Sequence, residues 1–247
     1  MQDISLQDML KAGVHFGHQQ KYRHPKMRPY IHTNRGGLYI VDLEQTAIKL
    51  REACEFLSHL ASQGGRVLFV GTKRQARSIV KEAAVAAGMP YVIERWIGGT
   101  LTNFDNIGKL GRRLKDLRVK LDQGQLDQYT KRERLQFSEE AADLEVVVGG
   151  IQDLTALPQA LFVVDIKKEK TAVREAISKK IPVVAIADTN VNPELVTYPI
   201  PANDDATKSI RMITGIVAAA IAEGKQQAAA TVAAKAAAPS PVPVANQ

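Results

Sequence analysis

Three aspartates stand where the strands of an α/β fold would end. Asp42, Asp165 and Asp188 each close a short apolar run. Ligands of doubly wound folds bind at the carboxyl ends of the strands, where carboxylates can hold Mg²⁺ or act as general acid and base. Such a cluster would suit a metal-dependent enzyme acting on a small molecule. Capping of the next turn or helix is the simpler interpretation, because no second catalytic group converges on these positions.

The sequence Gly-Thr-Lys at 71–73 is a candidate phosphate site. It follows an apolar run and opens a helical pattern, and backbone amides at such a junction can cradle a phosphate. Neither the complete dinucleotide pattern nor the complete P-loop pattern is present. Arg74, Arg77 and Lys81 extend the positive charge along the helix beyond what one nucleotide needs. The segment therefore favours RNA phosphates over a nucleotide.

Histidines and aspartates supply a candidate zinc site. Four of the five histidines fall within eighteen residues, and His15 and His18 together with Asp204 and Asp205 offer ligands that suit zinc. The His-x-x-His spacing in a basic segment is also typical of structural histidines or of histidines stacked on bases. We favour these two interpretations over a metal site. We expect no cofactor, with a structural Zn²⁺ or Mg²⁺ as the only candidates.

The positive charge of the chain is segregated. The 247 residues carry a net charge of +7, but residues 11–35 carry +6, residues 71–81 carry +4 and residues 109–134 carry +5, so the rest of the chain carries −8. Segregation of this kind is what a polyanion partner requires; three unrelated solvated faces are the alternative. Tyr22, Tyr30 and Trp96 lie among the cations and could stack on unpaired bases. Packing of Trp96 into the core is an equally good interpretation.

The apolar pattern predicts the elements that must position these residues. Runs typical of strands buried on both faces lie at 38–42, 66–70, 91–93, 161–165 and 183–187. Helical patterns lie at 43–60, 75–87, 171–180 and 206–223. Alternating strands and helices predict an α/β fold with a doubly wound, mainly parallel sheet of the Rossmann or flavodoxin type.

One segment breaks this alternation. Apolar residues recur at spacings of three and four from 107 to 121 and again from 137 to 148, which predicts an inserted, protruding coiled-coil hairpin over 103–148. The globular α/β domain would comprise 1–102 and 149–224, with a basic N-terminal segment over 1–37. Residues 225–247 are rich in Ala and Pro, and we expect them to be disordered.

Several classes of protein are excluded. The single cysteine, Cys54, forbids an intrachain disulfide and a cysteine-based zinc site. No apolar run approaches the roughly 20 residues that span a bilayer. The polar start of the chain resembles neither a signal peptide nor a transit peptide. We expect a cytoplasmic protein with no membrane partner.

Several ordered motifs then resemble one family. They are GVHFGH at 13–18, PKMRPYI at 25–31, LFVGTK at 68–73, ERWIGGTLTN at 94–103, ADTN at 187–190 and IPANDDA at 200–206. Together they resemble the small-subunit ribosomal protein S2 family in its bacterial or organellar form. Ala202 stands where the family commonly has glycine. The stretch QKYRH at 20–24 replaces an Arg-rich stretch with Trp, so that stacking would fall to Tyr22.

The resemblance implies a structural constituent of the small (30S) ribosomal subunit and not an enzyme. It implies binding to 16S rRNA between head and body, help in docking ribosomal protein S1, contacts with other small-subunit proteins, and no stand-alone homo-oligomer. A bacterial cytoplasmic ribosome is favoured over an organellar one. We assign RNA contacts to Lys11, Lys21, Tyr22, Arg23, His24, Lys26, Arg28, Arg35, Lys73, Arg74, Arg77, Arg95, Trp96, Asn103, Lys109, Arg112, Arg113 and Arg118.

Overall fold

A five-stranded parallel sheet forms the centre of the molecule. The structure is a computed structural model that describes residues 5–126 and 128–237. The strands are β4 (Val67–Val70), β5 (Tyr91–Val92), β6 (Ala160–Val164), β7 (Val183–Ala187) and β8 (Tyr198–Pro201), in the order β5-β4-β6-β7-β8. Every pairing is parallel. This is the flavodoxin-like order of a doubly wound fold, which confirms the predicted fold class.

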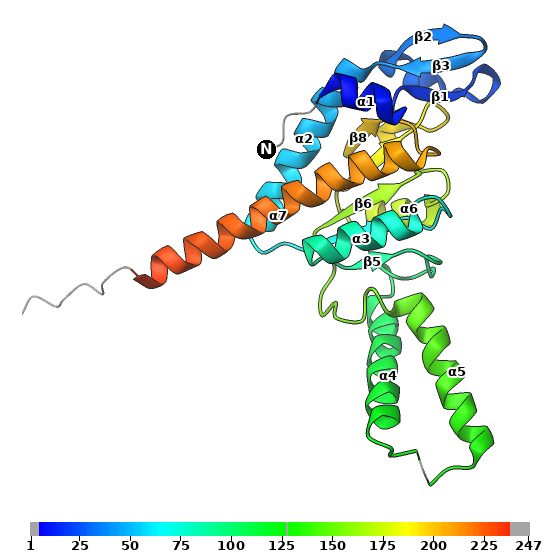
Figure 1. Cartoon of the computed structure of the whole chain (residues 1–247), viewed down its shortest axis with the longest axis vertical. Helices are drawn as coiled ribbons and strands as arrows, with labels where there is room; N and C mark the ends of the chain where they lie inside the picture. Colours follow the sequence, from blue (N-terminus) through cyan, green and yellow to red (C-terminus); the bar gives the residue numbers. More distant parts are fainter. Residues whose placement is uncertain (1–4, 127, 238–247) are drawn as a thin grey trace, which may run out of the picture.

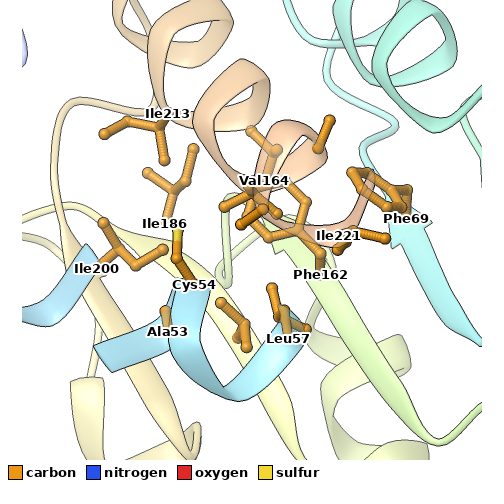
Figure 2. Packing of buried hydrophobic residues seen from close by; sticks show 14 of the residues in the cluster. Ala53, Cys54, Leu57, Phe69, Phe162, Val164, Ile186, Ile200, Ile213 and Ile221 are labelled. Carbon is orange, nitrogen blue, oxygen red and sulfur yellow. The ribbon is translucent and has the colours of Figure 1, made fainter. Parts of the chain in front are cut away.

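Helices cover both faces of this sheet. One face lies under α2 (Leu43–Ser62), α3 (Arg77–Ala87) and α7 (Thr207–Ala237), and the other lies under α6 (Lys170–Ser178) (Figure 1). Strand residues alternate between the two cores. Phe69 and Phe162 meet edge to face, 5.2 Å between ring centroids, on the α2 and α7 side (Figure 2). Leu68 and Leu161 point to the α6 side.

A second, smaller sheet precedes the parallel one. It contains β1 (Phe16–Gln19), β2 (Ile31–Arg35) and β3 (Leu38–Val41) in the antiparallel order β1-β3-β2, with α1 (Leu6–Ala12), η1 (Gln20–Tyr22) and η2 (Pro25–Tyr30) around it. We call residues 5–42 the N-terminal module. It lies at one end of the long axis of the molecule (Figure 1).

The prediction that residues 38–42 form a strand of the parallel sheet is wrong. β3 is the second arm of a hairpin with β2, joined by Gly36 and Gly37 at φ 61° and 79°. Two successive residues with positive φ form the two-residue turn that suits the twist of a hairpin. Leu38 is exposed, so β3 is not buried on both faces as its apolar run suggested.

Strand β8 was not predicted, because its sequence carries Pro199 and Pro201. β8 forms an edge of the parallel sheet and pairs only with β7. Proline is tolerated on an edge strand because no hydrogen bond between inner strands depends on the N–H that it lacks.

Two long helices form an arm at the other end of the molecule (Figure 1). They are α4 (Phe104–Asp122) and α5 (Lys131–Val148), and the apolar seam between them includes Ile107, Leu114 and Leu117. Thr130 and Glu133 form a capping box at the start of α5. These two helices stabilise each other through this seam, as the spacing of the apolar residues predicted. We call residues 103–148 the arm.

The C-terminal helix is longer than predicted. α7 runs to Ala237, so the expectation of disorder from residue 225 is wrong up to that point; the remainder, 238–247, lies outside the described residues. Alanine has the highest helix propensity, and the run extends a helix already anchored in the core. Lys225 Nζ donates to the carbonyls of Ala87 at 3.0 Å and Gly88 at 3.3 Å, which caps the end of α3.

Candidate nucleic-acid interface and the filled sheet edge

The carboxyl edge of the parallel sheet is occupied by charged side chains of the protein itself. Lys73 follows β4, Asp165 follows β6, and Asp204 and Asp205 follow β8. Lys73 Nζ lies 3.1 Å from Asp165 Oδ2, 2.7 Å from Asp204 Oδ1 and 2.7 Å from Asp205 Oδ1. We call this group, with Asp188 and His18, the edge cluster. It fills the position between β4 and β6 at which a flavodoxin-like sheet binds its ligand.

Burial and mutual repulsion shift the protonation of the edge cluster. Burial alone lowers the pKa of Lys73, but the surrounding carboxylates outweigh it and raise that pKa above its usual range. Burial, with the Asp165 and Asp188 carboxylates, raises the pKa of Asp204 to about 7 even though Lys73 opposes the shift. The single ammonium is therefore surrounded by more carboxylates than it can neutralise.

His18 joins this edge to the N-terminal module. Its Nδ1 lies 3.0 Å from Asp188 Oδ1 and its Nε2 lies 3.5 Å from Asp205 Oδ2. The hydrogen bond to Asp188 raises the pKa of His18 although burial opposes it. The backbone N–H of His18 donates to Thr189 Oγ1 at 2.8 Å. Gly17 is required beside it, because a Cβ there would lie 2.6 Å from the Thr189 methyl. The module thus closes over the sheet edge.

The metal-ligand geometry differs from the predicted set. His18, Asp188 and Asp204 each place a ligand atom within 4.8 Å of the others. His15 does not join them: its buried Nδ1 has no partner among the described residues, and burial lowers its pKa. The donor set suits zinc, but the Lys73 ammonium competes for the Asp204 carboxylate.

The predicted phosphate cradle at 71–73 is also filled. The backbone N–H and the hydroxyl of Thr72 donate to Glu169 Oε1 at 2.8 and 2.6 Å. Glu169 is 3% exposed, and burial raises its pKa. Arg77 pairs with Glu94 and donates from Nε to the Thr72 carbonyl at 3.1 Å. A carboxylate of the protein therefore takes the anion position that the sequence offered to a phosphate at Thr72. Of the predicted contacts here, only Arg74 is exposed.

The N-terminal module presents a different, open surface. Lys21, Arg23, Arg28 and Arg35 are exposed and form no ion pair within the part of the chain that the structure describes. Lys21 Nζ lies 4.8 Å from the ring centroid of Tyr22, whose side chain is 52% exposed. The other residues of the module that were predicted to contact RNA interact with the protein itself. Lys11 pairs with Asp8 and Lys26 with Glu194, and His24 Nδ1 accepts a hydrogen bond from the backbone N–H of Lys26.

A buried carboxylate organises the loop over residues 94–103. Glu175 of α6 accepts from Trp96 Nε1 at 3.0 Å and from the backbone N–H groups of Gly99 at 2.8 Å, Leu101 at 2.9 Å and Thr102 at 3.2 Å. These donors lower the pKa of Glu175, although burial alone raises it. Trp96 is only 9% exposed, and its ring packs in the core on the α6 side. Arg95 and Asn103, in the same loop, are exposed.

Much of the positive charge of the arm is neutralised within the protein. Arg113 forms two bonds with Glu140, at 2.9 and 3.0 Å, Arg118 pairs with Glu145, and Lys115 Nζ lies 2.7 Å from Asp153. Lys109 donates to Asn106 at 3.2 Å. Arg112 is exposed and forms no ion pair with any described residue. The basic excess of the arm therefore overstates the charge available to a partner.

These features define a class of protein. A doubly wound domain whose ligand-binding edge is filled by its own side chains, and whose exposed cations lie on a projecting module and an arm, is a binding scaffold and not an enzyme with an open cleft. None of the helices in the described ranges 5–126 and 128–237 is long and apolar enough to cross a membrane.

Comparison with known proteins identifies the family. A family model described as Ribosomal protein S2 matches residues 9–224. A protein of Fusobacterium nucleatum named "Small ribosomal subunit protein uS2" is 50% identical over 228 residues, which cover 92% of each chain. The chain belongs to the ribosomal protein S2 family, whose members are structural, non-enzymatic components of the small ribosomal subunit. The resemblance predicted from the motifs is confirmed, and the alternative of a metal-dependent enzyme is wrong.

Proposed function

We propose that this chain binds 16S rRNA between the head and the body of the small subunit, chiefly through the N-terminal module. One observation carries the proposal. The module presents four exposed cations that have no ion-pair partner among the described residues, and Tyr22 beside them is also exposed. Cations neutralise phosphates, and an exposed ring can stack on an unpaired base. Arg74, Arg95 and Arg112 extend the proposed interface. Lys73, Arg77 and Trp96 are left out, because the protein itself engages them.

We also propose that the chain helps dock ribosomal protein S1 and works in the bacterial cytoplasm. Both statements rest on the motifs shared with the family. The relative supports the compartment, since it is a small ribosomal subunit protein of a bacterium. The filled sheet edge supports a role through surfaces, because charged side chains of the protein occupy the position at which such a sheet binds a small ligand.

Charge reversal in the N-terminal module is expected to remove the protein from small subunits. Arg28→Glu combined with Arg35→Glu replaces two cations with carboxylates that repel phosphates, and the loss should grow as the salt of the wash is raised. Occupancy is measured by sedimentation of subunits through a gradient. The matched control is Arg51→Glu with Lys208→Glu, two exposed cations on α2 and α7. Equal occupancy of the two double variants would contradict the proposal.

The arm offers a sharper comparison between two neighbouring arginines. Arg112→Gln removes a free cation and should weaken subunit binding with no change in stability. Arg113→Gln breaks the bonds to Glu140 and should lower the stability of the arm by about 0.2–1 kcal/mol, the range of exposed ion pairs. Binding at two salt concentrations and thermal unfolding separate the two effects. If Arg112→Gln binds like the unaltered protein, the arm does not contact RNA at this position.

A further inference from the structure

Helix α6 and its flanks carry a wholly positive exposed face. The two acidic residues of 167–180, Glu169 and Glu175, are 3% and 8% exposed and are engaged by Thr72 and by the 94–103 loop. All the basic residues of this segment are exposed: Lys167, Lys168, Lys170, Arg174, Lys179 and Lys180. The net charge of segment 167–180 understates the charge of this face, because the two buried carboxylates are included in the sum.

The cations at the start of α6 do not serve the helix that carries them. Lys167, Lys168 and Lys170 lie at the start of α6, where the helix dipole favours acidic side chains. Lys180 has φ 57° just past the end of the helix, a left-handed conformation that favours glycine. None of the six forms an ion pair within the described residues. Their charges are therefore left for a partner outside the chain.

The chemistry of the face selects the partner. Its large apolar side chain is Ile177, 50% exposed, and no aromatic ring lies in the segment 167–180 to stack on an unpaired base. The nine residues of α6 span about 13 Å, a length over which several phosphates of a paired strand can be met. Shape and phosphate contacts, without base readout, are how proteins bind double-stranded RNA.

We propose that the α6 face binds the phosphate backbone of a base-paired RNA segment. This makes a second RNA contact on a different element from the N-terminal module, and it rests on the proposed function. Glu175 fixes the orientation of this face, because it ties α6 to the loop that leads into α4. The two contacts differ in kind: the module offers cations beside an exposed ring, and α6 offers cations alone.

Directed hydroxyl-radical cleavage tests the proposal on the full chain in small subunits. Ile177→Cys places a thiol in the centre of the face for attachment of an iron chelate. Cys54 does not compete, because it is 1% exposed and burial raises the pKa of its thiol to about 12. Asn34→Cys in the N-terminal module and Glu55→Cys on α2 are the matched positions; both are exposed. We expect breaks in a base-paired segment of rRNA from Ile177→Cys and few from Glu55→Cys.

Each outcome is informative. Breaks from Asn34→Cys with none from Ile177→Cys would overturn this inference and leave the proposed function intact, whereas breaks from neither would overturn both. Equal breaks from Glu55→Cys would remove the assignment to α6. As a second measurement, Lys170→Gln with Arg174→Gln should weaken subunit binding about tenfold relative to Arg51→Gln with Lys208→Gln. Weakened binding without RNA breaks would identify an acidic protein neighbour instead and overturn the proposal.

Discussion

Replacing Lys73 with methionine is expected to lower the free energy of unfolding by about 3–5 kcal/mol at neutral pH, as removal of one partner from a buried ion pair does. The ammonium lies within 3.1 Å of three carboxylates, and Asp204 among them is 1% exposed. Without the ammonium, the buried Asp204 carboxylate and the nearly buried Asp165 carboxylate repel each other with little solvent to screen them. Urea unfolding of the full chain measures the loss.

The pH dependence of this variant has a definite sign. Burial and neighbouring carboxylates already raise the pKa of Asp204 to about 7, and loss of Lys73 raises it further. The unfolded carboxyl is the same in both proteins, so the deficit depends on the protons that each folded protein binds. The folded variant binds more protons than the folded unaltered protein between its raised pKa and about pH 7, so its stability deficit shrinks as the pH falls through that range and levels off below it. Lys11→Met, which removes an exposed cation 3.6 Å from Asp8, should cost no more than about 1 kcal/mol. A small, pH-independent loss at Lys73 would show that the edge cluster does not stabilise the fold.

Glu175→Ala is expected to cost about 3 kcal/mol, since it leaves the indole N–H of Trp96 and three backbone N–H groups without their acceptor. Trp96 is the only tryptophan, so its fluorescence reports on this loop directly. We expect its emission to shift to the red as the ring gains contact with water. The arm should lose its fixed orientation as well, because α4 begins directly after this loop.

Two further variants check the interpretation of Glu175. Glu175→Gln keeps the shape of the side chain and one acceptor oxygen. It should therefore lower the free energy of unfolding by less than Glu175→Ala does, but by more than zero. Glu140→Ala removes an exposed carboxylate from the arm and should leave the tryptophan emission unchanged. If Glu175→Ala unfolds at the same urea concentration as the unaltered protein and keeps its emission, the carboxylate does not organise the loop.

The parallel sheet and the arm could be predicted because their signals are local. Short β-branched runs between amphipathic helices indicate buried strands, and apolar spacings of three and four indicate α4 and α5. The N-terminal sheet was missed because β1 and β2 are short and mostly exposed, and the Gly36 and Gly37 turn was not interpreted as a hairpin. The edge strand β8 was missed because of its prolines.

Only those parts of the candidate site that depend on the charge distribution alone could be predicted from the sequence. The exposed cations of the N-terminal module follow from the charge distribution. Lys73, by contrast, pairs with a residue 131 positions away, and Thr72 with one 97 positions away, so sequence spacing could not show that the loop was filled. Glu175 did leave a signal, since it lies among the apolar positions of α6, next to Ala176 and three residues after Ala172. An acidic side chain on an apolar face indicates a buried partner.

The salt dependence of binding tests the central claim, that exposed cations of the N-terminal module hold this protein on rRNA. The affinity of the full chain for small subunits that lack it is measured over a series of KCl concentrations, for the unaltered protein and for Arg28→Glu with Arg35→Glu. Each lost phosphate contact reduces the slope of log affinity against log salt by about one. We predict a slope smaller by about two, together with weaker binding. An unchanged slope and affinity would contradict the account.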